Sequence, residues 1–138
     1  MLVSEEIIDK VQETLPGLVV VEPFKFDNNY LALCVGDIVL AKVLPETALM
    51  QKLPWLEYVV PDLRSDAVVY IAYDLYNNSL MVVYKTVNNY IYEYLNIVFE
   101  DFAELLMQDS LGAALRKLVK GASFIKISTP TQLLKRLN

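Results

Sequence analysis

The sequence contains no histidine, one cysteine and only four glycines. Without histidine the chain lacks the commonest general base and metal ligand, and neither a Ser-His-Asp nor a Cys-His catalytic arrangement can form within it. The glycines do not cluster, so neither a G-x-G-x-x-G nor a P-loop pattern is present. A zinc site would depend almost entirely on carboxylates. We therefore expect a protein that is not an enzyme and that has no metal site and no cofactor.

Long apolar runs are also absent, although hydrophobic residues make up 55% of the chain. No stretch of about 18 uncharged apolar residues exists, which predicts no membrane span. The first residues, MLVSEEIIDK, show no basic region followed by an apolar stretch, so no signal peptide is expected. The single cysteine, Cys34, lies in an apolar run without basic neighbours, which predicts a buried and inert thiol. These features favour a cytoplasmic location.

Residues 67–98, AVVYIAYDLYNNSLMVVYKTVNNYIYEYLNIV, predict three antiparallel strands, 69–76, 79–87 and 90–98. The pairs Asn77-Asn78 and Asn88-Asn89 suit two-residue turns, because asparagine tolerates positive φ. The flanking Val, Ile, Tyr and Leu residues fit a pleated sheet. With two-residue loops, Tyr76 pairs with Ser79 and Val87 pairs with Tyr90.

This register gives the meander two chemically different faces. The predicted core face carries Val69, Ile71, Tyr73, Leu75, Leu80, Val82, Tyr84, Ile91, Leu95 and Ile97, with Glu93 as its one charged misfit. The opposite face, here called the predicted tyrosine face, carries Tyr70, Tyr76, Tyr90, Tyr92 and Tyr94. Such a face serves as a protein interface, stacks on nucleic-acid bases, or packs under the chain's own helices.

The remaining segments predict helices and strands on either side of the meander. Ser4 is the expected N-cap of a first helix that ends at Pro16-Gly17, and Thr129-Pro130 opens a last one. In order, we expect that first helix, strands over 18–26, 30–35 and 38–43, a helix over 45–53, a connection over 55–66, the meander, helices over 99–106 and 110–120, a strand over 122–127 and a helix over 130–137. This order predicts a single α+β domain, 1–138, with an antiparallel meander sheet packed by N-terminal and C-terminal helices.

Charge is divided unevenly along the chain. All seventeen acidic residues lie at or before Asp109, so residues 1–109 carry −11 and residues 110–138 carry +6. The basic residues of the second part are Arg116, Lys117, Lys120, Lys126, Lys135 and Arg136. This basic segment docks on the chain's own acidic body, meets a second copy, or contacts phosphates. In 110–120 the basic residues come late, which is typical of C-terminal dipole complementation rather than base reading.

In its short length, its abundance of Tyr, Val and Leu and its preference for Lys over Arg, the chain resembles small orphan proteins of hyperthermophilic archaeal viruses. That resemblance implies a location in the host cytoplasm. Our main hypothesis is a non-catalytic interaction protein that forms a homodimer, or binds another protein, through the predicted tyrosine face. The alternative is nucleic-acid binding through the basic segment 110–138. A third hypothesis is a metal-dependent nuclease built from Asp62, Asp66, Asp74 and Glu93.

Overall fold

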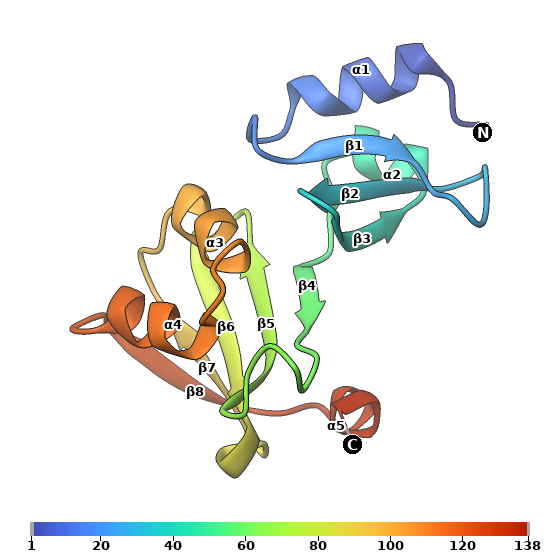
Figure 1. Cartoon of the computed structure of the whole chain (residues 1–138). Coiled ribbons are helices and arrows are strands. Elements are labelled where there is room, and N and C mark those ends of the chain that lie inside the picture. The colour runs from blue at the N-terminus through green and yellow to red at the C-terminus, as the bar shows by residue number, and fades with distance from the viewer. Residues whose placement is uncertain (1, 138) are drawn as a thin grey trace. The chain divides into compact units, whose positions relative to one another are not determined.

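A computed structural model describes residues 2–137 of the chain (Figure 1). The chain divides between Leu56 and Glu57 into two compact units. Helices and two antiparallel sheets, one of three strands and one of five, confirm the α+β fold class. The prediction of one domain for residues 1–138 stays a prediction, and the two units are described separately. Between Leu2 and Leu137, no helix combines the length and apolar character that crossing a bilayer requires.

The N-terminal unit consists of α1 (Glu5–Glu13), β1 (Val20–Pro23), β2 (Leu31–Val35), β3 (Ile38–Val43) and α2 (Pro45–Leu49). The strands form an antiparallel sheet in the order β1-β2-β3. Ser4 Oγ accepts a hydrogen bond from the Ile7 N–H, which confirms the predicted N-cap. Pro23 lies on an edge strand, where the missing N–H breaks no ladder bond in the middle of a sheet.

The strands predicted over 30–35 and 38–43 are joined as a hairpin by the two residues Gly36 and Asp37. Val35 pairs with Ile38, and Gly36 has φ 57°, a conformation that glycine adopts without steric cost. The following helix is shorter than predicted: α2 ends at Leu49 rather than near residue 53, and Gln51 turns the chain with φ 55°.

The C-terminal unit is built on a five-stranded sheet in the order β4-β5-β6-β7-β8. Its strands are β4 (Leu56–Val59), β5 (Val68–Asp74), β6 (Ser79–Tyr84), β7 (Tyr90–Tyr94) and β8 (Phe124–Ser128). Its helices are the 3-10 turn η1 (Lys85–Val87), α3 (Phe99–Leu106), α4 (Leu111–Val119) and α5 (Thr131–Leu137). The meander β5–β6–β7 is confirmed, whereas β4 replaces part of the connection predicted over 55–66.

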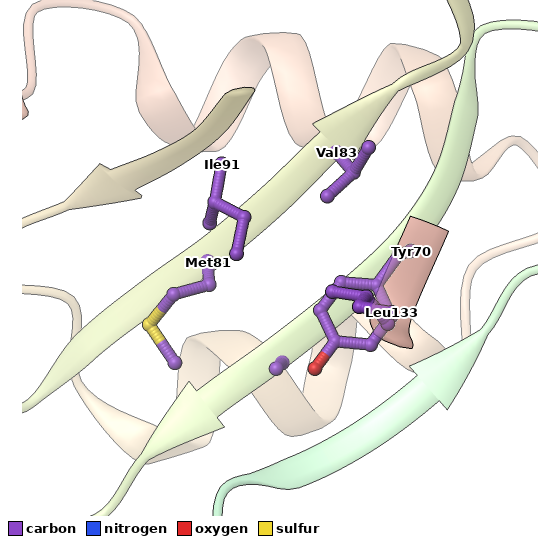
Figure 2. Packing of buried hydrophobic residues seen from close by; sticks show 6 residues of the cluster. Tyr70, Met81, Val83, Ile91 and Leu133 are labelled. Atoms are coloured by element: carbon purple, nitrogen blue, oxygen red, sulfur yellow. The ribbon is translucent and has the colours of Figure 1, made fainter. Parts of the chain in front are cut away.

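Helices cover both faces of the central strands. On one face, Tyr73 of β5 stacks on Phe102 of α3 at 5.2 Å between ring centroids and meets Phe99 edge-on at 5.5 Å. On the other face, shown in Figure 2, Leu133 of α5 packs with residues of three strands, namely Tyr70, Ala72, Met81, Val83 and Ile91. Burying each such large apolar side chain contributes about 1.5–3 kcal/mol. Of the three interpretations given for the face opposite the predicted core face, packing under the chain's own helices is the one that holds for β5 and β6.

The first turn of the meander is longer than predicted. Asp74, not Tyr76, pairs with Ser79, so four residues connect β5 and β6. The buried Asp74 carboxylate accepts hydrogen bonds from the N–H groups of Tyr76 and Asn77 and from the Asn77 side-chain amide, at 2.9, 3.3 and 2.7 Å. These bonds hold the longer loop. Because the register moves by two residues, the side chains keep their faces.

The second turn changes the face of β7. Strand β6 ends at Tyr84, and η1 precedes Asn88-Asn89, so the predicted pair Val87–Tyr90 does not form. The predicted pair Val87–Tyr90 would also have placed Tyr84 opposite Glu93. In the structure Met81 pairs with Glu93, so the register is shifted by three residues along β6. An odd shift moves every β7 side chain to the opposite face relative to its neighbours. It also explains the Glu93 misfit, because the buried Ser79 hydroxyl donates to the Glu93 carboxylate at 2.7 Å.

Candidate interaction surface

The structure does not place the five residues of the predicted tyrosine face together. Tyr70 lies on the α5 face of the sheet, 1% exposed, and its hydroxyl donates to the Glu57 carboxylate. Tyr76 lies in the β5–β6 connection and is 57% exposed. Tyr90, Tyr92 and Tyr94 share one face of β7 because they alternate along it. The prediction of one five-tyrosine face is wrong, and three of its members remain together.

Two of these three tyrosines, Tyr92 and Tyr94, belong to a cross-strand aromatic cluster. The hydroxyls of Tyr84 and Tyr94 are hydrogen-bonded at 2.7 Å, and Tyr84 meets Tyr92 edge-on at 5.3 Å between centroids. Phe124 of β8 lies 5.7 Å from both Tyr92 and Tyr94. Burial, followed by the bond to Tyr94, raises the pKa of the Tyr84 phenol. The cluster is buried at Tyr94 and opens toward solvent at Phe124, and Tyr90 on the same face of β7 is also partly exposed.

Lys126 of β8 lies against this cluster. Its Nζ is 5.6 Å from the ring centroid of Tyr90 and 5.5 Å from that of Tyr92, within the range of cation–π attraction. In the sequence, Lys126 stands out only as a member of the basic segment. Its contact with the rings depends on the pairing of Lys126 with Tyr92 across β7 and β8, which no sequence pattern indicates.

Strand β8 is exposed along its whole length, unlike the central strands. Phe124 is 50% exposed, Ile125 49% and Ile127 37%. Alternation puts Phe124 and Lys126 on the face of the aromatic cluster and both isoleucines on the other face. We call Tyr90, Tyr92, Phe124, Ile125, Lys126 and Ile127 the β8 edge surface. The strand predicted over 122–127 is confirmed, but the sequence did not show that it forms an edge.

The backbone of β8 has one hydrogen-bonding side free of strand partners. Within residues 2–137, β8 pairs with β7 alone. The Thr129 N–H donates to the Asn89 carbonyl and the Leu95 N–H donates to the Ser123 carbonyl, both at 2.9 Å. Since these directions alternate along a strand, the backbone groups of Phe124, Lys126 and Ser128 point away from β7. An outer edge that is apolar and carries one lysine has little of the protection that edge strands usually have.

The basic segment does not form one patch beside this edge. Arg136 of α5 lies 3.5 Å from the Glu57 carboxylate, so part of the segment docks on the chain's own acidic residues. Arg116 lines a groove of about 500 Å³ with the loop 62–68, and Lys117 lines a second groove of about 290 Å³ beside Asp101 and Glu104. Lys120 and Lys135 are exposed. Helix α4 lies on the α3 side of the sheet and α5 on the other side (Figure 1), which separates the basic side chains.

The four acids considered for a metal site have separate structural roles or positions. Asp62 and Asp66 lie in the loop that lines the larger groove, Asp74 holds the β5–β6 turn, and Glu93 accepts from Ser79. In the part of the chain that the structure describes, no three Cys, Asp or Glu side chains form a group that could hold a metal ion.

Cys34 is buried in β2 of the N-terminal unit, as the sequence predicted. Its Sγ donates to Glu22 at 3.6 Å. Burial, and then the negative charge of Glu22, raises the pKa of the thiol to about 11. A thiol with so high a pKa is a poor nucleophile near neutral pH.

Comparison of the sequence with protein-family models finds no match, and comparison with curated proteins finds none. The resemblance to small proteins of archaeal viruses stays a prediction. The interpretation of the β8 edge surface therefore rests on its geometry and chemistry.

Proposed function

We propose that this chain is a small, non-catalytic interaction protein that binds its partner at the β8 edge surface. The observation that carries this proposal is the combination on β8 of apolar side chains exposed on both faces with backbone groups directed away from the sheet. Side chains exposed on a single face fit an ordinary solvated sheet, whereas exposure on both faces together with an unpaired backbone fits the addition of another strand.

The backbone groups supply the affinity expected for such binding. An extended segment placed beside β8 meets the N–H and C=O groups of Phe124, Lys126 and Ser128, and each new bond replaces one to water. The net gain is about 0.5–1.5 kcal/mol for a typical bond. Several bonds in one ladder are needed before association outweighs the loss of translational and rotational freedom.

The side chains supply the selectivity. Phe124 and the tyrosines form an aromatic surface with one charge, Lys126, whereas Ile125 and Ile127 form an aliphatic surface on the other face. The centres of protein interfaces are enriched in aromatic residues and depleted of charged ones, and the β8 edge surface has this composition. A partner strand with apolar residues at alternating positions on both faces matches the β8 edge surface best.

Selection of extended peptides against the full chain from a random peptide library tests the proposal. We expect the bound peptides to protect the amides of Phe124, Lys126 and Ser128 in hydrogen exchange. The variant Lys126→Pro removes an outward N–H without removing a bond to β7, and it should abolish binding, whereas Lys126→Ala keeps that N–H and should bind. Selected peptides that protect other segments, or that bind Lys126→Pro unchanged, would refute the proposal.

Nucleic-acid binding is the second candidate, and the position of Lys126 over Tyr90 and Tyr92 favours it. Exposed rings beside a cation can stack on the bases of a single strand and contact its phosphates. Fluorescence anisotropy with labelled oligo-dT and oligo-U at low salt tests this candidate. It predicts binding that weakens steeply with salt and is lost on replacing Lys126 by alanine. No binding to either oligonucleotide at low salt would exclude it.

A further inference from the structure

The outer edge of β8 is complementary to itself. A two-fold axis perpendicular to the sheet places two β8 strands side by side and antiparallel, and it keeps each side chain on its own face. Phe124, Lys126 and Ser128 of one copy then meet residues of the same set in the other copy, because all three direct their backbone groups outward. Odd-numbered residues likewise meet odd-numbered residues.

Of the registers centred on Ile125, Lys126 and Ile127, which are the three inner residues of β8, only the first satisfies both the charges and the backbone. Centring the pair on Lys126 would put that ammonium opposite its own copy, and like charges directly opposite each other are destabilising. Centring it on Ile127 would put Pro130, which has no N–H, opposite the outward-facing Phe124. Centring it on Ile125 puts isoleucine against isoleucine on one face and Phe124 against Lys126 on the other.

The register centred on Ile125 also extends a contact that the single chain already makes. Lys126 lies over the rings of Tyr90 and Tyr92, and the second copy's Phe124 would give it a third aromatic neighbour. On the opposite face the two Ile125 side chains, each 49% exposed, would cover one another. Aromatic and β-branched cross-strand pairs of this kind stabilise sheets.

Charge favours a second copy over a strongly charged partner. The C-terminal unit, residues 57–138, contains eight basic and nine acidic residues, which leaves a net charge of −1. A nearly neutral surface opposes self-association very little. An acidic partner strand would need several cations along the edge, and β8 carries Lys126 alone.

We propose that two copies of this chain pair antiparallel through β8, with Ile125 at the two-fold axis and the two sheets joined into one. This inference rests on the proposed function, because it names the partner of the β8 edge surface. It differs from the homodimer that the sequence suggested, since the contact is a strand edge in a defined register rather than a sheet face.

Single cysteines introduced into a Cys34→Ala background test the register, because the chain has no other thiol. In the proposed register the two Ile125 Cα atoms lie about 4.5 Å apart, within the range of a disulfide. Under mild oxidation Ile125→Cys should therefore form linked dimers, whereas Lys126→Cys and Ile127→Cys should form them at least about tenfold more slowly. Faster linking of either of the last two variants overturns the register.

Sedimentation equilibrium of the full chain tests the partner. We expect a dimer whose dissociation constant rises at least about tenfold in Ile125→Lys, which sets two ammonium groups at the axis. Leu63→Lys adds the same charge at a fully exposed leucine of the same unit and should leave the dimer unchanged. A monomer at all concentrations, or a dimer that Ile125→Lys does not weaken, overturns the inference. Peptide binding at β8 by a monomeric chain would overturn it while leaving the proposed function intact.

Discussion

The Tyr70 hydroxyl donates a hydrogen bond to the Glu57 carboxylate, and Arg136 lies 3.5 Å from the same oxygen. Three segments distant in sequence, β4, β5 and α5, meet at this carboxylate. The contact joins an acid of the first part of the chain to a base of the last part. The basic segment therefore makes one of its contacts with an acidic residue of the same chain.

Removing the Tyr70 hydroxyl should destabilise the C-terminal unit. Tyr70→Phe removes the buried donor to the Glu57 carboxylate and leaves it only the more distant, exposed Arg136, which we expect to cost about 1–3 kcal/mol in the free energy of unfolding. Urea denaturation followed by circular dichroism measures this change. Tyr90→Phe removes a hydroxyl from a partly exposed ring and should change stability by less than about 0.5 kcal/mol. Equal effects of the two substitutions would contradict the role given to the Tyr70–Glu57 bond.

The stability of the fold should decrease in alkaline solution. Burial, and then the charge of Glu100, raises the pKa of Tyr73 from 10.0 to about 12, and burial also raises the pKa of Tyr70 and Tyr84. A raised folded-state pKa contributes stability that is complete below pH 10 and is lost as pH rises through 12.

Tyr73→Phe removes both the titrating hydroxyl and the hydrogen bond that it donates to the Ile97 carbonyl at 2.6 Å. The two losses are told apart by pH, because the hydrogen bond matters at pH 8 and the titration only above pH 10. The variant should be less stable at pH 8, and its stability should fall less steeply between pH 10 and 12, than in the parent chain. Urea unfolding at pH 8, 10 and 11 gives both quantities. Identical slopes in the two proteins would show that Tyr73 does not contribute to the alkaline loss.

The carboxylate of Asp74 should determine the β5–β6 loop. Asp74→Ala removes the acceptor of three hydrogen bonds in a buried position and should cost about 1–3 kcal/mol. Asp74→Asn keeps one acceptor oxygen and should cost less. Asp66→Ala, at an exposed loop position, is the control and should change the unfolding free energy by less than about 0.5 kcal/mol. If Asp74→Ala unfolds at the same urea concentration as the parent chain, the Asp74 carboxylate does not determine the turn.

Cys34 should react slowly with thiol reagents in the folded chain. Its pKa of about 11 leaves little thiolate at pH 8, and the side chain is 3% exposed. We expect the rate of labelling by a disulfide reagent to rise by at least about a hundredfold in denaturant, where the thiol regains a pKa near 8.5 and full access. Labelling at similar rates in folded and unfolded chains would mean that β2 does not bury this thiol.

The order of helices and strands was predictable because local signals mark most of its boundaries. Ser4 caps α1, Gly36 closes the β2–β3 hairpin, and both asparagine pairs fall between strands. Strand β4 was missed because its four residues lie between Pro54 and Pro61 and alternate too briefly to show a period. Each of these outcomes depends on only a few neighbouring residues.

Register and sheet edges were not predictable in the same way. The Asp74 side chain and the η1 turn lengthen the two connections, and an odd shift was enough to move Ile91 from one face to the other. That β8 pairs with β7 and lies at the sheet edge depends on contacts between Tyr90–Tyr94 and Phe124–Ser128. No periodicity within either segment contains that information, so the sequence identified the three tyrosines of β7 that share a face but not the edge beside them.

The central claim, that the outer edge of β8 receives a second strand, is tested most directly by amide hydrogen exchange at two protein concentrations. At a concentration well above the dimer dissociation constant, the amides of Phe124, Lys126 and Ser128 should exchange slowly, and on dilution their protection should disappear while that of Ile125 and Ile127 persists. Fast exchange of Phe124, Lys126 and Ser128 at every concentration would contradict the account.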